Sequence, residues 1–172
     1  PALSARLTDA GFTVDVLSSN EIGAGLERST AAIAQLVGRC EIAADEPWRL
    51  RAGEASVFPW QDDSVTPGAL LAMRLRAGLF VVDTERPSIE GARWDRAWGR
   101  AVLRAGARGL LLVPVQAEAV SPLLHDIYDA VLRDGASAMQ AVNAAKRRAI
   151  DRGEPVALWS ACQLWAGKFR DE

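Results

Sequence analysis

The sequence predicts an α/β fold in which helices cover a mostly parallel β-sheet, and three observations lead to this prediction. Two short runs, Leu79 to Val82 and Leu110 to Val115, are apolar throughout, as is typical of strands buried on both faces. Segments with helical periodicity alternate with these runs along the chain. The length of 172 residues suits one domain better than two. We therefore expect residues 1–172 to form a single α/β domain.

The first part of the chain predicts two strands on either side of a helix. Alternating apolar residues predict a strand over Phe12 to Val16. Ser18 to Glu21 fits a capping box, and the apolar spacing predicts a helix from Ile22 to Leu36 behind it. A second short strand is expected from Cys40 to Ala44, and Pro47 disfavours helix in the residue before it.

The middle of the chain predicts two helices, each followed by one of the apolar strands. Thr66 is expected to cap a helix whose first residue is Pro67, and Gly78 is expected to close it. A helix over residues 90–105 is expected to stop at Gly106.

The last part predicts two further helices and a closing strand. An apolar stripe predicts a helix over Leu123 to Leu132, and a capping box at Ser137 to Gln140 predicts another that runs to Ile150. The turn Gly153-Glu154-Pro155 is expected to lead into a final strand over Val156 to Trp165.

Composition excludes several classes of protein. The charges are 20 basic and 22 acidic residues, a net of -2, so nucleic acid is not an expected partner. No run of 18 apolar residues predicts a membrane span, and no signal peptide is recognised. Cys40 and Cys162 are too far apart for a CxxC site. We expect a cytoplasmic protein without a cofactor.

Four segments, taken in chain order, suggest a family. They are Leu70 to Val82, Leu103 to Val115 with its Ala-Gly-Ala-Arg turn, Asp134 to Val142, and Glu154 to Ala161. Their order and spacing resemble those of the CHAT domain, a caspase-like peptidase module of clan CD. The resemblance implies a three-layer α/β/α sandwich without the family's first strand, and a chain that is a portion of a longer protein.

The resemblance also implies that the catalytic dyad is lost. In active members, a strand like Cys40 to Ala44 ends in His-Gly, and a strand like Leu79 to Val82 ends in Ser-Ala-Cys-Glu-Thr-Gly. By position, Asp45 replaces the histidine and Glu85 replaces the cysteine. The single histidine, His125, belongs to a predicted helix remote from both strand ends. Since a cysteine nucleophile needs a base, we expect no catalytic residues.

The expected function is therefore that of a catalytically inactive, CHAT-like pseudopeptidase acting as a regulatory or protein-interaction module. Its expected partner is a protein or a peptide, and the resemblance implies a homodimer through Val156 to Trp165. The residues expected at a binding surface are Asp83, Arg86, Trp48 and Trp60.

Two alternatives stay open at this point. Acidic side chains at predicted strand ends are ligands suited to Mg²⁺, so one alternative is a metal-dependent hydrolase built on Asp45, Asp83 and Glu85. The other is a cysteine peptidase with an unorthodox site.

Overall fold

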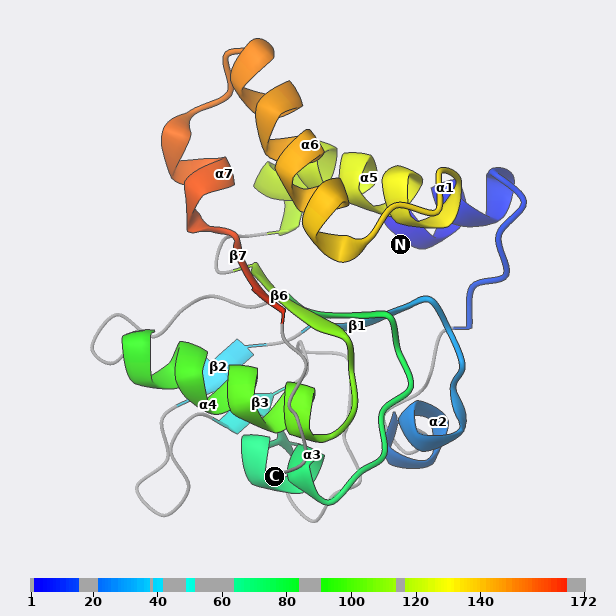
Figure 1. The fold of residues 1–172 in the computed structure, drawn as a ribbon, viewed down its shortest axis with the longest axis vertical. Coiled ribbons are helices and arrows are strands. Elements are labelled where there is room, and N and C mark those ends of the chain that lie inside the picture. Colours follow the sequence, from blue (N-terminus) through cyan, green and yellow to red (C-terminus); the bar gives the residue numbers. More distant parts are fainter. Residues whose placement is uncertain are drawn as a thin grey trace.

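The computed structural model describes residues 2–15, 22–37, 39–41, 49–51, 64–83, 91–113 and 117–166. Its main sheet has four strands in the spatial order β1-β5-β6-β7 (Figure 1). The first three are parallel to one another, and the last is antiparallel to its neighbour. The strands are β1 (Ile33–Val37), β5 (Leu79–Asp83), β6 (Gly109–Val113) and β7 (Gln163–Ala166). The predicted α/β class with a mostly parallel sheet is confirmed.

Helices lie on both faces of this sheet (Figure 1). One face is covered by α1 (Ala2–Asp9), α5 (Ala117–Leu132), α6 (Ala138–Asp151) and α7 (Val156–Ala161). The other face is covered by α2 (Ile22–Arg28), α3 (Pro67–Leu71) and α4 (Gly91–Arg104). None of the helices among the described residues combines the length and the apolar character that crossing a membrane requires.

Alternating side chains of β5 join the two halves of the core. Phe80 and Val82 pack in one cluster with Trp98 of α4, whereas Leu79 and Val81 pack in the other with α5 and α6. All five residues of β5 are buried. This explains why the strand has no polar residue before its last position, since both of its faces meet apolar layers.

A second, smaller sheet is antiparallel. It contains β2 (Arg39–Glu41), β3 (Arg49–Arg51) and β4 (Ser64–Val65), in that order. The sequence predicts a strand over Cys40 to Ala44. The structure has the three-residue strand β2 at its start, which lies outside the main sheet, and residues 42–48 are outside the described part of the chain.

Two predicted helix starts, at Thr66 and at Ser137, are confirmed in atomic detail, whereas the capping box predicted at Ser18 to Glu21 lies outside the described residues. The backbone N–H of Ala69 donates to Thr66 Oγ1 at 3.1 Å, with Pro67 as the first helical residue. The capping box of α6 is complete, since Ser137 and Gln140 each satisfy a backbone N–H of the other. These caps are local contacts, so the sequence alone can predict them.

The end of α4 is also as predicted. Gly106 has a φ of 111°, and its N–H donates to the carbonyl of Leu103 while that of Ala107 donates to Val102. This pair of bonds closes the helix in a Schellman motif with glycine at the C′ position.

Three predicted elements are wrong. The first is the strand over Phe12 to Val16: residues 12–15 belong to no strand or helix, and Val16 is outside the described residues. The alternation of apolar and polar side chains reflects half-burial of the apolar ones, and the segment pairs with no strand. The guanidinium of Arg133 lies 5.9 Å from the centre of the Phe12 ring, so the aromatic side chain packs against the end of α5 instead.

The second is the helix from Ile22 to Leu36, which ends at Arg28 because Ile33–Val37 forms β1. The N–H of Ala31 donates to Ser29 Oγ at 3.1 Å, a local bond that competes with helix continuation. Pairing with the buried strand β5 then stabilises the extended conformation of β1. A pattern of local periodicity cannot reveal this pairing.

The third is the strand over Val156 to Trp165, of which residues 156–161 form α7 and only 163–166 form β7. Similarly, α3 ends at Leu71 rather than at Gly78. Gly78 serves a close approach of backbones instead, because a Cβ there would lie 2.9 Å from the carbonyl oxygen of Ala32.

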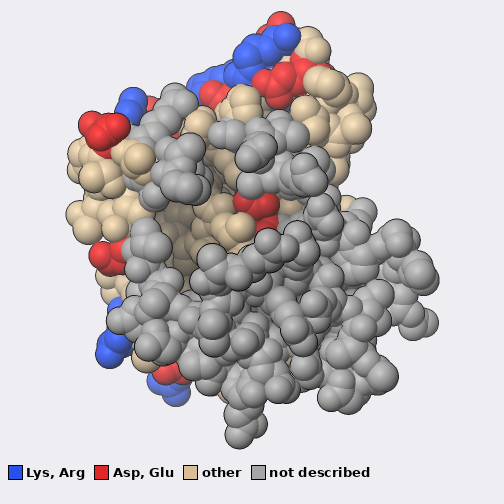
Figure 2. Space-filling model, turned by 180° about the vertical axis from the view of Figure 1, so that it is seen from behind, with Lys and Arg blue, Asp and Glu red and all other residues tan. Residues whose placement is uncertain are grey.

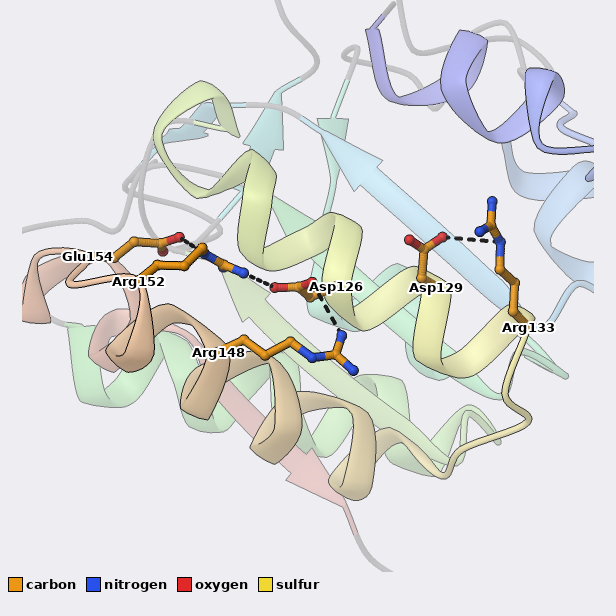
Figure 3. A network of polar contacts seen from close by, with 6 residues as sticks. All are labelled: Asp126, Asp129, Arg133, Arg148, Arg152 and Glu154. Atoms are coloured by element: carbon orange, nitrogen blue, oxygen red, sulfur yellow. Dashed lines mark hydrogen bonds and ion pairs between the residues drawn. The ribbon is translucent and has the colours of Figure 1, made fainter.

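A surface network fastens α5 to α6. The Asp126 carboxylate accepts from Arg148 Nη1 at 3.3 Å and from Arg152 Nη1 at 2.7 Å, and Arg152 Nε donates to Glu154 (Figure 3). On the face seen in Figure 2, the described basic and acidic side chains are interleaved at the α6 end of the molecule. We interpret this network as a structural clamp between two helices.

Candidate functional site

The candidate site lies at the carboxyl end of β5, where Asp83 is the last residue of the strand. Its side chain is buried, with 3% of its surface exposed. Because β1, β5 and β6 are parallel, their carboxyl ends share one edge of the sheet, and ligands of open α/β sheets bind at such edges. Asp83 is the one residue of the expected binding set that falls within the described part of the chain.

A chain of hydrogen bonds connects Asp83 to two other elements. Gln35 Nε2, from β1, donates to Asp83 Oδ2 at 3.1 Å. The phenolic O–H of Tyr128, from α5, donates to Gln35 Oε1 at 2.8 Å. The two partners fix the orientation of the Gln35 amide, since only its oxygen can accept and only its nitrogen can donate.

The strand register explains why these side chains meet. Gln35 pairs with Val81, which lies two residues before Asp83. Because side chains two residues apart lie on the same face of a strand, Gln35 and Asp83 both point toward the layer that contains α5. Tyr128 is buried among the apolar residues of that layer, with only 2% of its surface exposed.

Burial dominates the electrostatics of the site. It raises the pKa of Asp83 from 3.8 to about 6, although the hydrogen bond from Gln35 acts in the opposite direction. Burial, followed by the charge of Asp83, also raises the pKa of Tyr128 well above its ordinary value. The phenol therefore remains protonated and acts as a donor at every physiological pH.

Cys162 lies between α7 and β7, whereas the sequence predicts it inside a strand over Val156 to Trp165. It is buried, and its thiol donates to the carbonyl oxygen of Leu158 at 3.6 Å. Burial raises the pKa of this thiol to about 11, although the charge of Lys146 lowers it. Lys146 Nζ itself donates to the carbonyl oxygen of Cys162 at 2.7 Å. The thiol is therefore protonated near neutral pH.

The other expected site residues lie outside the described residues. These are Asp45, Glu85, Arg86, Trp48 and Trp60. Their expected roles at the lost dyad, at a binding surface or in a metal site stay predictions. Among the side chains that the structure does describe, no three or more histidine, cysteine or acidic groups are arranged to hold a metal ion.

The topology changes one part of the expected site. The parallel strand next to β5 is Ile33–Val37, whereas Cys40 belongs to the small antiparallel sheet. The expected position of Asp45 follows from a predicted strand over Cys40 to Ala44, whose described residues Cys40 and Glu41 lie in the small sheet. His125 lies on α5, as predicted, and is partly buried there.

Two residues of the site, Gln35 and Tyr128, are absent from the sequence-based set. The sequence predicts a helix at Gln35, and a helix gives no indication that this residue aligns with the end of β5. The sequence feature that could have identified Gln35 is its side-chain amide, which is the single polar group within the otherwise apolar run Ile33 to Val37. Tyr128 is hidden within an apolar helical stripe, where its ring packs as a core residue would.

Comparisons with known proteins leave the family of this chain unassigned. Neither the protein-family models nor the curated proteins that were searched gave a match to it.

Proposed function

We propose that this chain is a catalytically inactive, CHAT-like pseudopeptidase that works as a regulatory protein-interaction module. A mostly parallel sheet with helices on both faces is compatible with the fold that the resemblance implies. The observation that carries the proposal is the chemical state of two side chains at the sheet. The carboxyl group of Asp83 ends β5, and the thiol of Cys162 is protonated.

The state of Cys162 argues against a nucleophilic role. A cysteine peptidase attacks through a thiolate, which a neighbouring base or positive charge must stabilise. The Cys162 thiol instead donates its proton to a backbone carbonyl within a buried environment that raises its pKa. This is the behaviour of a small core side chain.

The orientation of Asp83 also favours a structural role over nucleophilic catalysis. In the family that this chain resembles, the strand like Leu79 to Val82 leads to the cysteine. Here the residue that ends β5 turns its carboxylate toward Gln35 and the α5 layer. The side chain at this strand end thus supports packing between elements.

The last strand offers a surface for a partner. Within the described residues, β7 is the edge of the main sheet and pairs on one side with β6. Its four residues, Gln163–Ala166, carry no charge that would oppose pairing with another strand. Strand addition at such an edge binds an extended peptide or a second copy through main-chain hydrogen bonds.

A peptidase assay tests the loss of catalysis. Against fluorogenic peptides that vary the residue before the scissile bond, we expect the wild-type chain to show no hydrolysis above buffer. The double variant Cys40→Ala/Cys162→Ala is the matched control, and an active cysteine peptidase sets the detection limit. Hydrolysis by the wild-type chain that disappears in the double variant would refute the proposal.

Sedimentation tests the interaction surface. We expect the wild-type chain to form a dimer at micromolar concentrations, and Ala166→Lys to be monomeric, because a lysine on the exposed end of β7 opposes edge pairing. Ala157→Lys, at an exposed position of α7, makes the same charge change away from the edge and should stay dimeric. A wild-type monomer at all concentrations, or a dimer that Ala166→Lys leaves intact, would contradict pairing through β7.

A further inference from the structure

A group of exposed arginines, here called the arginine surface, lies on the side of the main sheet that α4 covers. Its members are Arg74, Arg76, Arg96, Arg100, Arg104 and Arg108. Three of them belong to α4 and are spaced four residues apart, so they lie along one face of the helix. Trp98 and Val102 of the same helix are buried in the core instead. The outer face of α4 is therefore a row of positive charges.

The extended segment that follows α3 places two more arginines beside the end of this row. Arg74 and Arg76 are exposed on either side of Leu75, which is buried. The N–H of Leu75 donates to the carbonyl of Ala105 at 2.6 Å, and Ala105 directly follows the last residue of α4. The segment thus runs next to the C-terminal end of the helix.

Arg108, in the turn after α4, completes the arginine surface. Its N–H donates to the carbonyl of Ala77 at 3.2 Å, so it lies beside the residue that follows Arg76. Because Arg108 directly precedes β6, this part of the surface is at the amino ends of the strands, away from Asp83 at the carboxyl end of β5. Figure 1 shows α4 and the segment after α3 on the side of the sheet opposite α6.

The charge of the arginine surface is not neutralised within the part of the chain that the structure describes. The ion pairs found there involve other arginines, which are Arg133, Arg148 and Arg152. Asp95, the one acidic residue of α4, is buried with 5% of its surface exposed. Like charges four residues apart on a helix repel, so this row opposes folding slightly. The clamp between α5 and α6 therefore offers no parallel for its role.

Neighbouring and distant charges make the arginine surface a local feature. Helix α2 contributes Leu26 to the same core cluster as α4, and its exposed Glu27 and Arg28 cancel each other in charge. The whole chain has a net charge of -2. A concentration of positive charge at one place is therefore balanced by an acidic remainder of the chain.

We propose that the arginine surface is a docking site for an acidic segment of a partner protein, rich in aspartate and glutamate. The proposal goes beyond the proposed function, because it concerns a surface separate from β7 and does not depend on the loss of catalysis. Guanidinium groups bind carboxylates through two parallel hydrogen bonds. The row on α4 is about 12 Å long at the helical rise per residue, which is the length of about four residues of extended peptide.

Two observations favour an acidic protein segment over nucleic acid. Single strands bind by stacking their bases on exposed aromatic rings, and the aromatic side chains that the structure describes are buried or only partly exposed. A long polyanion also extends beyond the arginine surface and meets the acidic remainder of the chain, which repels it. A short acidic segment avoids this repulsion.

Fluorescence anisotropy with the intact chain tests the proposal, and the probe is fluorescein-labelled decaglutamate. We expect saturable binding at low ionic strength that weakens as salt is added, because the attraction is between exposed charges. Labelled decaglutamine and decalysine are the matched control peptides and should not bind. Absence of decaglutamate binding, or equal binding of decaglutamine, would overturn the proposal.

Three charge reversals locate the binding. Arg100→Glu on α4 and Arg76→Glu on the adjoining segment are each expected to weaken decaglutamate binding about fivefold, since each replaces an attraction by a repulsion. Arg147→Glu makes the same change at an exposed position of α6 and should alter the affinity by less than about twofold. Equal losses in all three variants would show a response to net charge alone, which contradicts a defined surface. If Arg100→Glu fails to fold, the comparison of Arg76→Glu with Arg147→Glu decides.

Two further probes distinguish the kind of partner. They are labelled decathymidylate and vesicles of phosphatidylcholine with phosphatidylserine. Weaker binding of both than of decaglutamate supports the proposal. Tighter binding of either one, lost in Arg100→Glu, would assign the arginine surface to nucleic acid or to a membrane and overturn it. Sedimentation of Arg100→Glu should match that of the wild-type chain, so failure at this surface is distinguishable from failure of pairing through β7.

Discussion

Asp83→Asn is expected to gain about 2 to 3 kcal/mol of stability relative to the wild-type chain as the pH rises from 4 to 7.5. The folded chain raises the pKa of this carboxyl group from 3.8 to about 6, so the folded state binds the proton more tightly than the unfolded state does. The stabilisation from the bound proton is present below pH 3.8 and is lost as the pH rises through 6. Asparagine still accepts the hydrogen bond from Gln35 but carries no charge at any pH.

The measurement is urea unfolding of both proteins across this pH range, with the free energy of unfolding compared at each pH. The comparison removes the contributions of all other titrating groups that the two chains share. Asp126→Asn is the control, since this carboxylate lies on the surface between arginines. Curves for the wild-type chain and Asp83→Asn that run parallel from pH 4 to 7.5 would show that Asp83 titrates alike in the folded and unfolded states.

Gly106→Ala is expected to destabilise the fold by at least about 2 kcal/mol. The backbone at Gly106 has a φ of 111°, which residues with a Cβ rarely adopt. A Cβ at this position would also lie 2.6 Å from the carbonyl oxygen of Leu75, which belongs to the backbone and has little freedom to move. The same region is fixed by the N–H of Leu75, which donates to the carbonyl of Ala105 at 2.6 Å.

Gly135→Ala is the matched control for this prediction. Gly135 also has a positive φ, of 64°, but a Cβ there would meet no atom within 4 Å. Its substitution should therefore cost about 1 kcal/mol, from the backbone conformation alone. Thermal and urea unfolding of the two variants measure the difference, and equal losses would mean that the close approach to Leu75 carries no penalty.

The parts of the fold that the sequence predicts well are those encoded by local chemistry. Thr66 and Ser137 cap helices through side chains that reach backbone groups three residues away, and Gly106 ends a helix through its own φ. The strands β5 and β6 are recognisable because continuous apolar runs suit burial on both faces. Each of these features is recognisable from residues within the segment itself.

The parts that sequence patterns miss depend on pairing between distant segments. Ile33–Val37 becomes a strand because β5, more than 40 residues away, provides a partner along its whole length. The site shares this origin, since Gln35 and Asp83 are 48 residues apart and Tyr128 is 93 residues from Gln35. Asp83 was recognisable because it ends an apolar run, whereas its partners follow from tertiary structure.

Tyr128 is the only tyrosine among the 172 residues. Its hydroxyl is bonded directly to the side chain that contacts Asp83. Isotopic labelling of tyrosine alone would thus give a magnetic resonance spectrum with a single ring, located at the junction of β1, β5 and α5. The chain carries its own spectroscopic probe at this junction, without an added fluorophore or an engineered residue.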